Sequence, residues 1–473
     1  ISMVARVPIM FAVTLWSHIS FPSLQAHATA TAVEGERSPN KEAANTQLAI
    51  FEWKRGDSIR QYISQPMRPA LIKNSPVNGW RSAKWTPTTL SGMLGKAKIP
   101  VKNSTGNVFH MGCCALHRVE LREAIERCEA GSEEEYIYFS GPLSHFGKVW
   151  AGREINLDMF NMKEVPIDAA KEAGDVILKA HLWIGSKGVV TPTHFDEMHN
   201  FFVQIYGSKT FTLLPPSAWA RLQLYPKFHH QHRNVIADLE DEKTFKSLFS
   251  DPSSGMMTVT LSAGDLLYVP PLWFHRVETI SKTSISANIW SASKTVHGAN
   301  KAWLESFPVD VDWGFVETIR VISEFLRQLI KAILPKERIL SYVTELKQAR
   351  YESLYRFGEN ITTACPFEIY EESHEIKEHN KYLEQVESEA PSFLSQTDIK
   401  KTAYEMWCNP SEKTTKKAAE YVPNVKRHFD GLDQGMAEIY LGNYIEDLAS
   451  QIVGFEEIVK YLESCISRPL SEK

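Results

Sequence analysis

The fold is decided by residues 181–214, which read HLWIGSKGVVTPTHFDEMHNFFVQIYGSKTFTLL. Short apolar runs rich in β-branched and aromatic residues alternate here with turn residues, a pattern typical of consecutive β-strands. The pattern resumes after a long insertion between residues 215 and 255 and continues to Ser293. Repeated short strands at this spacing predict an all-β barrel or jelly roll. We therefore expect a mainly β fold whose core spans residues 181–293.

Helical patterns follow this β region. Apolar residues recur at three- and four-residue steps from Phe315 to Ile333, which predicts an amphipathic helix that ends before Pro335. We therefore divide the ordered chain into a β domain over residues 51–300 and an α-helical C-terminal region over residues 301–473. The fold class expected is mainly β with added helices.

The first 30 residues have the layout of a secretory signal peptide. Arg6 precedes the apolar run Val7–Trp16, and the small residues Ala28-Thr-Ala30 follow a polar stretch. A disordered N-terminal extension is the alternative interpretation. Residues 31–50 are predicted to be a flexible linker. With a cleaved signal the protein would work in the secretory pathway or ER lumen, and otherwise in the cytoplasm or nucleus.

Composition narrows the classes of function. The chain has 473 residues, with 52 Lys and Arg against 57 Asp and Glu, for a net charge of −5. It offers no broad basic field for a phosphate backbone, so nucleic acid is not an expected partner. No apolar run reaches the length of about 18 residues that a membrane-spanning helix needs. The six cysteines form no C-x-x-C pair, which favours buried free thiols over a zinc ribbon.

A metal site is predicted by the segment Thr191-Pro-Thr-His194-Phe-Asp196. Residues two apart on a strand point to the same face, so the His194 imidazole and the Asp196 carboxylate converge. A lone His-x-Asp occurs by chance in many proteins, and a metal needs a third ligand. His275 is the candidate, because it follows Gly264-Asp-Leu-Leu-Tyr-Val-Pro-Pro-Leu-Trp-Phe in the same β region. Two histidines and a carboxylate suit non-haem Fe(II), although zinc accepts the same ligands in tetrahedral form.

This region resembles the Jumonji-C family of oxygenases. The likeness covers residues 50–300 and rests on His194-Phe-Asp-Glu-Met-His-Asn200, Gly207-Ser-Lys209, Gly264-Asp265, Trp273-Phe-His275 and Asn288-Ile-Trp290. Within the family the likeness is nearest to the asparaginyl hydroxylase type that acts on hypoxia-inducible factor. The resemblance implies a double-stranded β-helix of the cupin kind, with Fe(II) held by His194, Asp196 and His275. It also implies 2-oxoglutarate as co-substrate and O2 as oxidant.

The resemblance implies further site residues. Lys209, Thr191 and Tyr138 would hold the distal carboxylate of 2-oxoglutarate. Asn200 and Asn288 would line the other end of the co-substrate and the iron ligands.

The substrate side resembles the family less closely. Arg233-Asn234 stands where the asparaginyl hydroxylase type has an Arg-Gln pair, so both are candidate substrate residues. Because an asparagine side chain is a methylene shorter than glutamine, selectivity for asparagine does not carry over. We expect Trp273, Trp290 and Phe202 to be barrel packing rather than substrate contacts.

These residues favour a dioxygenase that hydroxylates a side chain of a protein or peptide. A lysine demethylase and an RNA-nucleoside hydroxylase of the same family are alternatives, as is a non-catalytic Jumonji-like scaffold that binds partners. By position, the C-terminal helices resemble the helical pair through which related hydroxylases dimerise. We therefore expect a homodimer through these helices.

Overall fold

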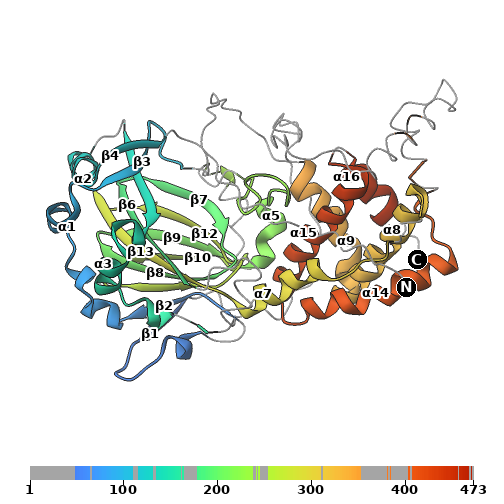
Figure 1. The fold of residues 1–473 in the computed structure, drawn as a ribbon, viewed down its shortest axis with the longest axis horizontal. Helices are drawn as coiled ribbons and strands as arrows, with labels where there is room; N and C mark the ends of the chain where they lie inside the picture. Colours follow the sequence, from blue (N-terminus) through green and yellow to red (C-terminus); the bar gives the residue numbers. More distant parts are fainter. Residues whose placement is uncertain are drawn as a thin grey trace.

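The computed structural model describes residues 48–352 apart from 64–66, 110–115, 132–134, 161, 164–177, 238–240, 242, 245–253 and 310–312, residues 407–467 apart from 456, and residues 381, 384, 403, 404 and 470. The N-terminal segment up to residue 47, with the expected leader and most of the expected linker, lies outside the described residues. β-Strands form one half of the molecule and C-terminal helices form the other (Figure 1). The expected fold class, a β core followed by helices, is confirmed.

Among the described residues, two sheets make up the β half. The larger sheet has nine strands in the order β1 (Ala49–Glu52), β2 (Ala70–Lys73), β11 (Leu266–Val269), β8 (His199–Tyr206), β13 (Thr283–Ser291), β6 (Leu178–Ser186), β5 (Tyr136–Pro142), β3 (Lys98–Ser104) and β4 (Leu116–Glu120). The smaller has four strands in the order β10 (Met257–Leu261), β9 (Lys209–Leu214), β12 (Phe274–Thr279) and β7 (Val190–Phe195). All neighbours pair antiparallel except β1 and β2.

The two sheets enclose an apolar core at one end and a cavity at the other. Phe202 of β8 meets Phe211 of β9 with ring centroids 4.7 Å apart, and both belong to a buried cluster that draws side chains from both sheets. The cavity lies beyond these rings and is lined by residues of both sheets. A jelly roll of this kind therefore presents inward-facing side chains of facing strands to one space.

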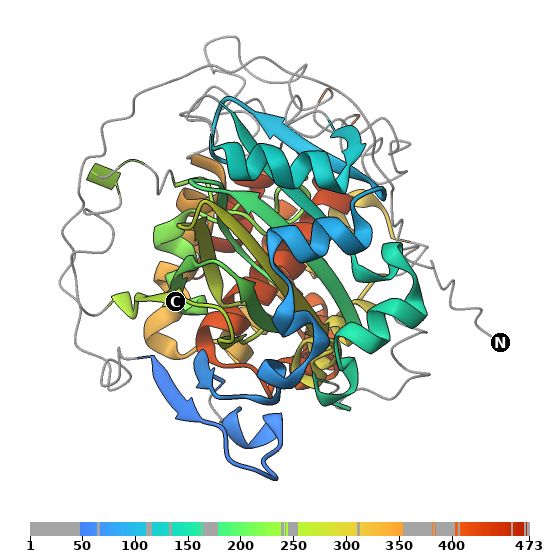
Figure 2. The ribbon, with the colours of Figure 1, turned by 90° about the vertical axis from the view of Figure 1, so that its left-hand side faces the viewer.

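Helices cover the outer face of the larger sheet. These are α1 (Pro87–Leu94), α2 (Leu121–Ala130) and α3 (Lys148–Glu154). They contribute Leu90, Leu121, Ile125 and Ala151 to a buried cluster shared with the strands, and in Figure 2 the blue and cyan helices lie in front of the sheet. Because both faces of this sheet are covered, a central strand such as β8 is buried along nearly its whole length.

The C-terminal half is a helical module built around α15. Its helices are α7 (Lys294–Asn300), α8 (Phe315–Ile333), α9 (Lys336–Lys347), α14 (Glu412–Lys426), α15 (Gln434–Val453) and α16 (Ile458–Tyr461), and the short α5 (Trp219–Leu222) of the β domain lies against them. The helix predicted from Phe315 to Ile333 is confirmed as α8. Helix α15 is buried almost all round, as expected of the central helix of a bundle. No helix in the described part of the chain is long and apolar enough to cross a bilayer.

One continuous core joins the module to the β domain. Phe195 and Phe274, which flank the predicted ligands His194 and His275, stack edge to face at 5.5 Å and belong to the same buried cluster as helices α8 and α15. At Gly435 of α15 an added Cβ would lie 2.4 Å from the Ser217 nitrogen. The helix therefore approaches the segment after β9 more closely than any side chain would allow.

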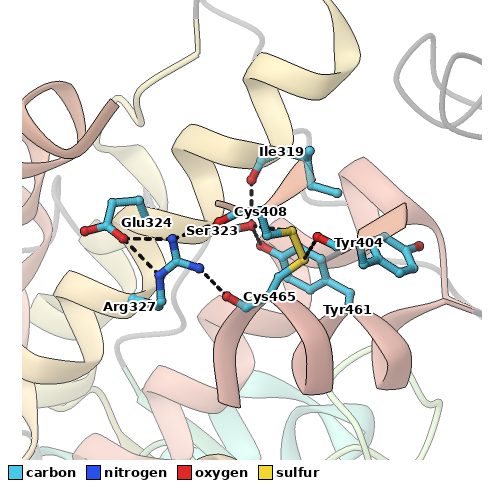
Figure 3. The surroundings of a disulfide bond; sticks show 8 residues. All are labelled: Ile319, Ser323, Glu324, Arg327, Tyr404, Cys408, Tyr461 and Cys465. Carbon is cyan, nitrogen blue, oxygen red and sulfur yellow. Dashed lines mark hydrogen bonds and ion pairs between the residues drawn. A yellow bond between two sulfur atoms is a disulfide. The ribbon is translucent and has the colours of Figure 1, made fainter. Parts of the chain in front are cut away.

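A disulfide links Cys408 to Cys465 within the module, with Cα atoms 5.2 Å apart. The expectation of free thiols was wrong for this pair, because two cysteines 57 residues apart are brought together by helix packing rather than by a local motif. Cys128 is buried and free, as expected. Beside the disulfide, Arg327 donates to the carbonyl oxygens of both cysteines and pairs with Glu324 (Figure 3).

We expect the double variant Cys408→Ser/Cys465→Ser to lower the stability of the helical module. Opening a loop of this length removes about 4 kcal/mol of stabilisation in the chain-entropy model. Denaturant unfolding with and without reductant, followed by the circular dichroism of the helices, measures the loss. Wild type in reductant should match the double variant, and equal stability of oxidised wild type and variant would contradict the expectation.

Candidate metal and co-substrate site

The three predicted metal ligands meet at one point. His194 on β7 and His275 on β12 are directly paired across the smaller sheet, and their ring centroids lie 4.2 Å apart. The His275 Nε2 is 3.8 Å from the Asp196 Oδ2. One ligand atom from each of the three side chains lies within 4.8 Å of the other two, which a single ion can span. No other group of this kind occurs among the residues that the structure describes.

Backbone contacts orient both imidazoles. The Nδ1 of His194 lies 2.8 Å from the Pro192 carbonyl oxygen, and the Nδ1 of His275 lies 3.1 Å from the Trp273 carbonyl oxygen. Because a carbonyl oxygen only accepts, each Nδ1 must carry the hydrogen. Each Nε2 is then left as the basic atom, which is the arrangement that metal-binding histidines use.

The backbone also ties the two halves of the triad together. The Leu272 amide, in the turn before β12, donates to the Asp196 carbonyl oxygen at 2.7 Å. Leu272 is fully buried and has a φ of 61°. This left-handed backbone conformation is energetically unfavourable for a residue with a bulky side chain. Strain of this kind persists where the surrounding structure fixes the chain, here beside the predicted ligands.

Electrostatics hold His194 and Asp196 in the protonation states that a metal requires. Burial, and then the neighbouring His275, lower the pKa of His194 to about 4. Burial by itself would raise the pKa of Asp196, but His275, His194 and Arg233 outweigh it and lower that pKa below its usual value. At neutral pH the site therefore offers a neutral imidazole at His194 and a carboxylate at Asp196, which are the states of metal ligands.

A chain of polar side chains fixes the Asp196 carboxylate. Its Oδ2 accepts from the Asn200 amide and from the Trp290 indole, each at 2.9 Å. The Asn288 amide in turn donates to the Asn200 Oδ1 at 2.9 Å. Asn200 therefore contacts a predicted iron ligand, while Asn288 stands behind it and also lines the cavity.

Trp290, which we expected to be barrel packing, also makes a polar contact at the triad. Its indole N–H contacts a candidate ligand directly. The signal was present in the sequence, because Trp290 is two residues from Asn288 on one strand and so faces the same side. The Trp273 indole N–H does point away from the triad, since it donates to the Met67 carbonyl oxygen.

We expect Trp290→Phe to weaken metal binding about 10- to 100-fold, the range for losing a partner of a metal ligand. The ring is kept and only the N–H to Asp196 is lost. Titration of Mn(II) followed by electron paramagnetic resonance measures the affinity. Trp273→Phe, which loses an N–H away from the triad, is the matched control, and equal affinities of the two variants would contradict the role of Trp290.

Lys209 lies at the inner end of the cavity and is suited to bind an anion. Its side chain is 2% exposed, and its Nζ lies 5.6 Å from the ring centroids of both Tyr138 and Phe202. The Tyr138 hydroxyl is 2.9 Å from the Thr191 hydroxyl. Within the described residues no carboxylate pairs with Lys209. A buried cation of this kind favours a ligand carboxylate as its partner.

Burial lowers the pKa of Lys209 to about 7, which predicts a pH-dependent affinity for 2-oxoglutarate. The ammonium form is the one that attracts a carboxylate, and without ligand it is lost as the pH rises through about 7. Binding should therefore weaken about tenfold for each unit above this pKa and stay level just below it. Anaerobic calorimetry with Mn(II) protein between pH 6 and 9 measures this. Lys209→Arg stays charged over this pH range, so its affinity for 2-oxoglutarate should not change with pH. A wild-type affinity that is the same at every pH would contradict the lowered pKa of Lys209.

The cavity brings together nearly all of the predicted residues. Its volume is about 690 Å³, enough for a co-substrate and a substrate side chain together. Of the predicted site residues it is lined by His194, Asp196, His275, Lys209, Thr191, Tyr138, Asn288, Arg233 and Asn234. The Asn288 Oδ1 is buried there and has no hydrogen-bond partner among the described residues. The donor set of the triad and the buried Lys209 ammonium fit Fe(II) with an anionic chelate.

The candidate substrate residues lie beside the metal ligands. The Arg233 carbonyl oxygen accepts from the Phe195 amide at 3.0 Å, and the Arg233 guanidinium is 3.8 Å from the Asp196 Oδ1. Asn234 pairs with His194 through an isolated β-bridge. Trp183, which the sequence reasoning missed, also lines the cavity, and its ring stacks on Tyr138 at 5.5 Å.

Comparison with known proteins agrees with this geometry. Residues 11–295, more than half of the chain, match the family model described as the Cupin-like domain. HSPB1-associated protein 1 of Rattus norvegicus is 28% identical over 277 residues, which cover 54% of each chain. Lysine-specific demethylase JMJ30 of Arabidopsis thaliana is 32% identical over 232 residues, covering 48% of this chain and 50% of its own. Jumonji C domain-containing protein 5 of Drosophila melanogaster is 32% identical over 234 residues, covering 47% and 54%. The chain thus spans about half the length of these relatives.

Proposed function

Because this chain belongs to the Cupin-like domain family, we propose that it is an Fe(II)- and 2-oxoglutarate-dependent dioxygenase that hydroxylates a side chain of a protein. The observation that carries the proposal is the meeting in one cavity of a His-Asp-His triad and a buried lysine that pairs with no carboxylate among the described residues. Relatives named for the JmjC domain and for lysine demethylation support the wider class.

One set of residues would bind Fe(II) and another would bind 2-oxoglutarate. His194, Asp196 and His275 would hold Fe(II) on one face and leave the rest of its coordination sphere open. Lys209, Thr191 and Tyr138 would hold the distal carboxylate of 2-oxoglutarate, and Asn200 and Asn288 would line its other end and the iron ligands. When bound, iron and 2-oxoglutarate together supply the activation of O2 for oxidation of a C–H bond.

Side chains of this protein orient the Asp196 carboxylate, place apolar rings beside the charged groups and keep a proton on the Tyr138 hydroxyl. Burial raises the pKa of Tyr138 well above its usual value, so its hydroxyl keeps its proton and can donate to a carboxylate. Asn200 and Trp290 stop the Asp196 carboxylate from rotating. Phe202 and Phe211 line the cavity and contact each other there, and charge contacts beside such apolar rings are stronger than in water.

The identity of the target side chain rests on the outer wall of the cavity. We propose that Arg233 and Asn234 contact the target, since both line the cavity next to the metal ligands. The asparaginyl hydroxylase type is supported by the Jumonji-C motifs alone, because the Arg-Asn pair departs from the Arg-Gln pair of that type. The relative named as a lysine-specific demethylase favours an N-methyl group as the second candidate target.

Turnover with synthetic peptide pools tests the proposal. Purified protein with Fe(II), ascorbate, 2-oxoglutarate and a pool should release succinate and add one oxygen to a peptide by mass spectrometry. Release of formaldehyde from a pool of methyl-lysine peptides would instead identify a demethylase, and oxidation of an RNA pool would identify a nucleoside hydroxylase. His194→Ala is the control for each assay. Identical output from wild type and this control would refute the enzyme and favour a scaffold that binds partners.

We propose that the protein is a homodimer through its C-terminal module. Most apolar side chains of the module are buried within one chain, but Leu304 and Leu340 are 73% and 54% exposed and could form a contact. Light scattering at micromolar concentration should give twice the chain mass. Leu340→Lys should give the mass of one chain, and a wild-type mass of one chain would refute the proposal.

A further inference from the structure

A loop over residues 224–235 lies between the candidate iron site and the helical module. Its ends are held together by the bridge between Leu224 and Val235. On the side of the iron site it is bonded to β7, where the Phe195 amide donates to the Arg233 carbonyl oxygen at 3.0 Å and the Val235 amide donates to the Thr193 carbonyl oxygen at 3.3 Å. The loop, which contains the candidate substrate residue Arg233, is therefore bonded to the strand that bears His194.

The opposite side of this loop is bonded to a buried carboxylate of the helical module. Glu446 of α15 accepts from the Lys227 amide at 2.7 Å. The same carboxylate pairs with the Arg350 guanidinium at 2.8 Å and accepts from the Tyr351 hydroxyl at 2.9 Å. The side chains of Glu446 and Arg350 are both 0% exposed.

A second contact lies next to the first. The Phe228 ring of the loop packs on Phe455, just after α15, with ring centroids 4.4 Å apart. Phe228 also approaches Tyr351, at 6.2 Å. The loop thus makes one charged hydrogen bond to the C-terminal half of α15 and one aromatic contact to Phe455, just beyond the end of that helix.

The three partners of the Glu446 carboxylate hold it in one position. A buried carboxylate is costly unless several donors satisfy it, and here an arginine, a tyrosine and a backbone amide do so. Two of these donors come from the π-helical turn Gln348–Glu352, so the carboxylate cannot move without leaving a buried charge unpaired. A hydrogen bond from a backbone amide to an ionised acceptor is also stronger than a neutral one.

We propose that Glu446 is a positioning residue: it fixes the 224–235 loop, and through the loop it sets Arg233 beside Asp196 at the substrate side of the cavity. The proposal rests on the proposed function for its consequence in turnover, but not for the structural coupling itself. It gives the helical module a role in substrate recognition, because a displacement of about 1 Å at a positioning residue can cost orders of magnitude in rate.

Two matched variants test this coupling. Glu446→Gln and Glu324→Gln each neutralise a buried glutamate of the module that is paired with a buried arginine. Glu324 lies on α8, and within the described part of the chain its carboxylate bonds to Arg327 and Gln328 rather than to the loop. Hydrogen–deuterium exchange of the whole protein reports the amides of residues 224–237. We expect Glu446→Gln to speed their exchange by about tenfold or more and Glu324→Gln to leave it at the wild-type rate. Equal exchange in the two variants would overturn the proposal.

The second readout is the ratio of succinate released with a turned-over peptide pool to that released without peptide. It should fall about tenfold or more in Glu446→Gln and stay unchanged in Glu324→Gln, and an unchanged ratio in both would overturn the substrate role. Should Glu446→Gln fail to fold, Phe455→Ala breaks the adjacent contact and is judged by the same two measurements. A wild-type protein without turnover would refute the proposed function, whereas the exchange comparison would still decide the role of Glu446.

Discussion

Replacing His275 with alanine is expected to abolish both metal binding and turnover. His275 supplies one of three ligand atoms that lie within 4.8 Å of one another, and its Nε2 has no substitute on β12. A bound metal contributes several kcal/mol to catalysis, and each 1.36 kcal/mol is about a factor of ten in rate. We therefore expect activity to fall about a thousandfold or more, with Mn(II) and Fe(II) affinity falling in parallel.

His297→Ala is the matched control for this variant. His297 also lines the cavity and is 8% exposed, but it stands outside the triad. Calorimetric titration with Mn(II) should show one site per chain in wild type and in His297→Ala, and none in His275→Ala. Retention of tight, stoichiometric binding in His275→Ala would show that the ion, if any, is held elsewhere.

The second large effect is expected at Lys209. Changing it to methionine keeps most of the side-chain volume and removes the buried ammonium. Losing one partner of a buried charge pair costs about 2 to 5 kcal/mol, so the affinity for 2-oxoglutarate should fall about 30-fold or more, while metal binding in the absence of 2-oxoglutarate stays intact. Anaerobic calorimetry with Mn(II) protein separates these two affinities.

Lys179→Met provides the comparison. Lys179 also lines the cavity but is exposed on β6. Lys179→Met therefore changes the net charge by the same amount as Lys209→Met but leaves the buried ammonium of Lys209 in place. Its affinity for 2-oxoglutarate should stay within about threefold of wild type, the size of a screened surface charge effect. If Lys179→Met and Lys209→Met weaken binding equally, the co-substrate is held by general charge rather than by a buried partner.

Local patterns in the sequence predicted much of the β domain and of the site. The two-residue period of a strand placed His194 and Asp196 on one face, and α8 followed from the spacing of its apolar residues. The same two-residue period also places Trp290 on the face of the strand that Asn288 occupies. These features depend on the geometry of one strand or one helix, which neighbouring residues determine by themselves.

Other features depend on segments that are far apart along the chain. The pairing of Cys408 with Cys465, the ion pair of Arg350 with Glu446 and the bond from Lys227 to Glu446 carry no periodicity or motif.

The sequence by itself therefore determined the β class, the ligand types and the helical character of the C-terminal region. Only the tertiary structure decided which carboxylate of α15 meets the loop beside Asp196, because the packing of helices against a sheet selects such partners by shape and burial rather than by local spacing.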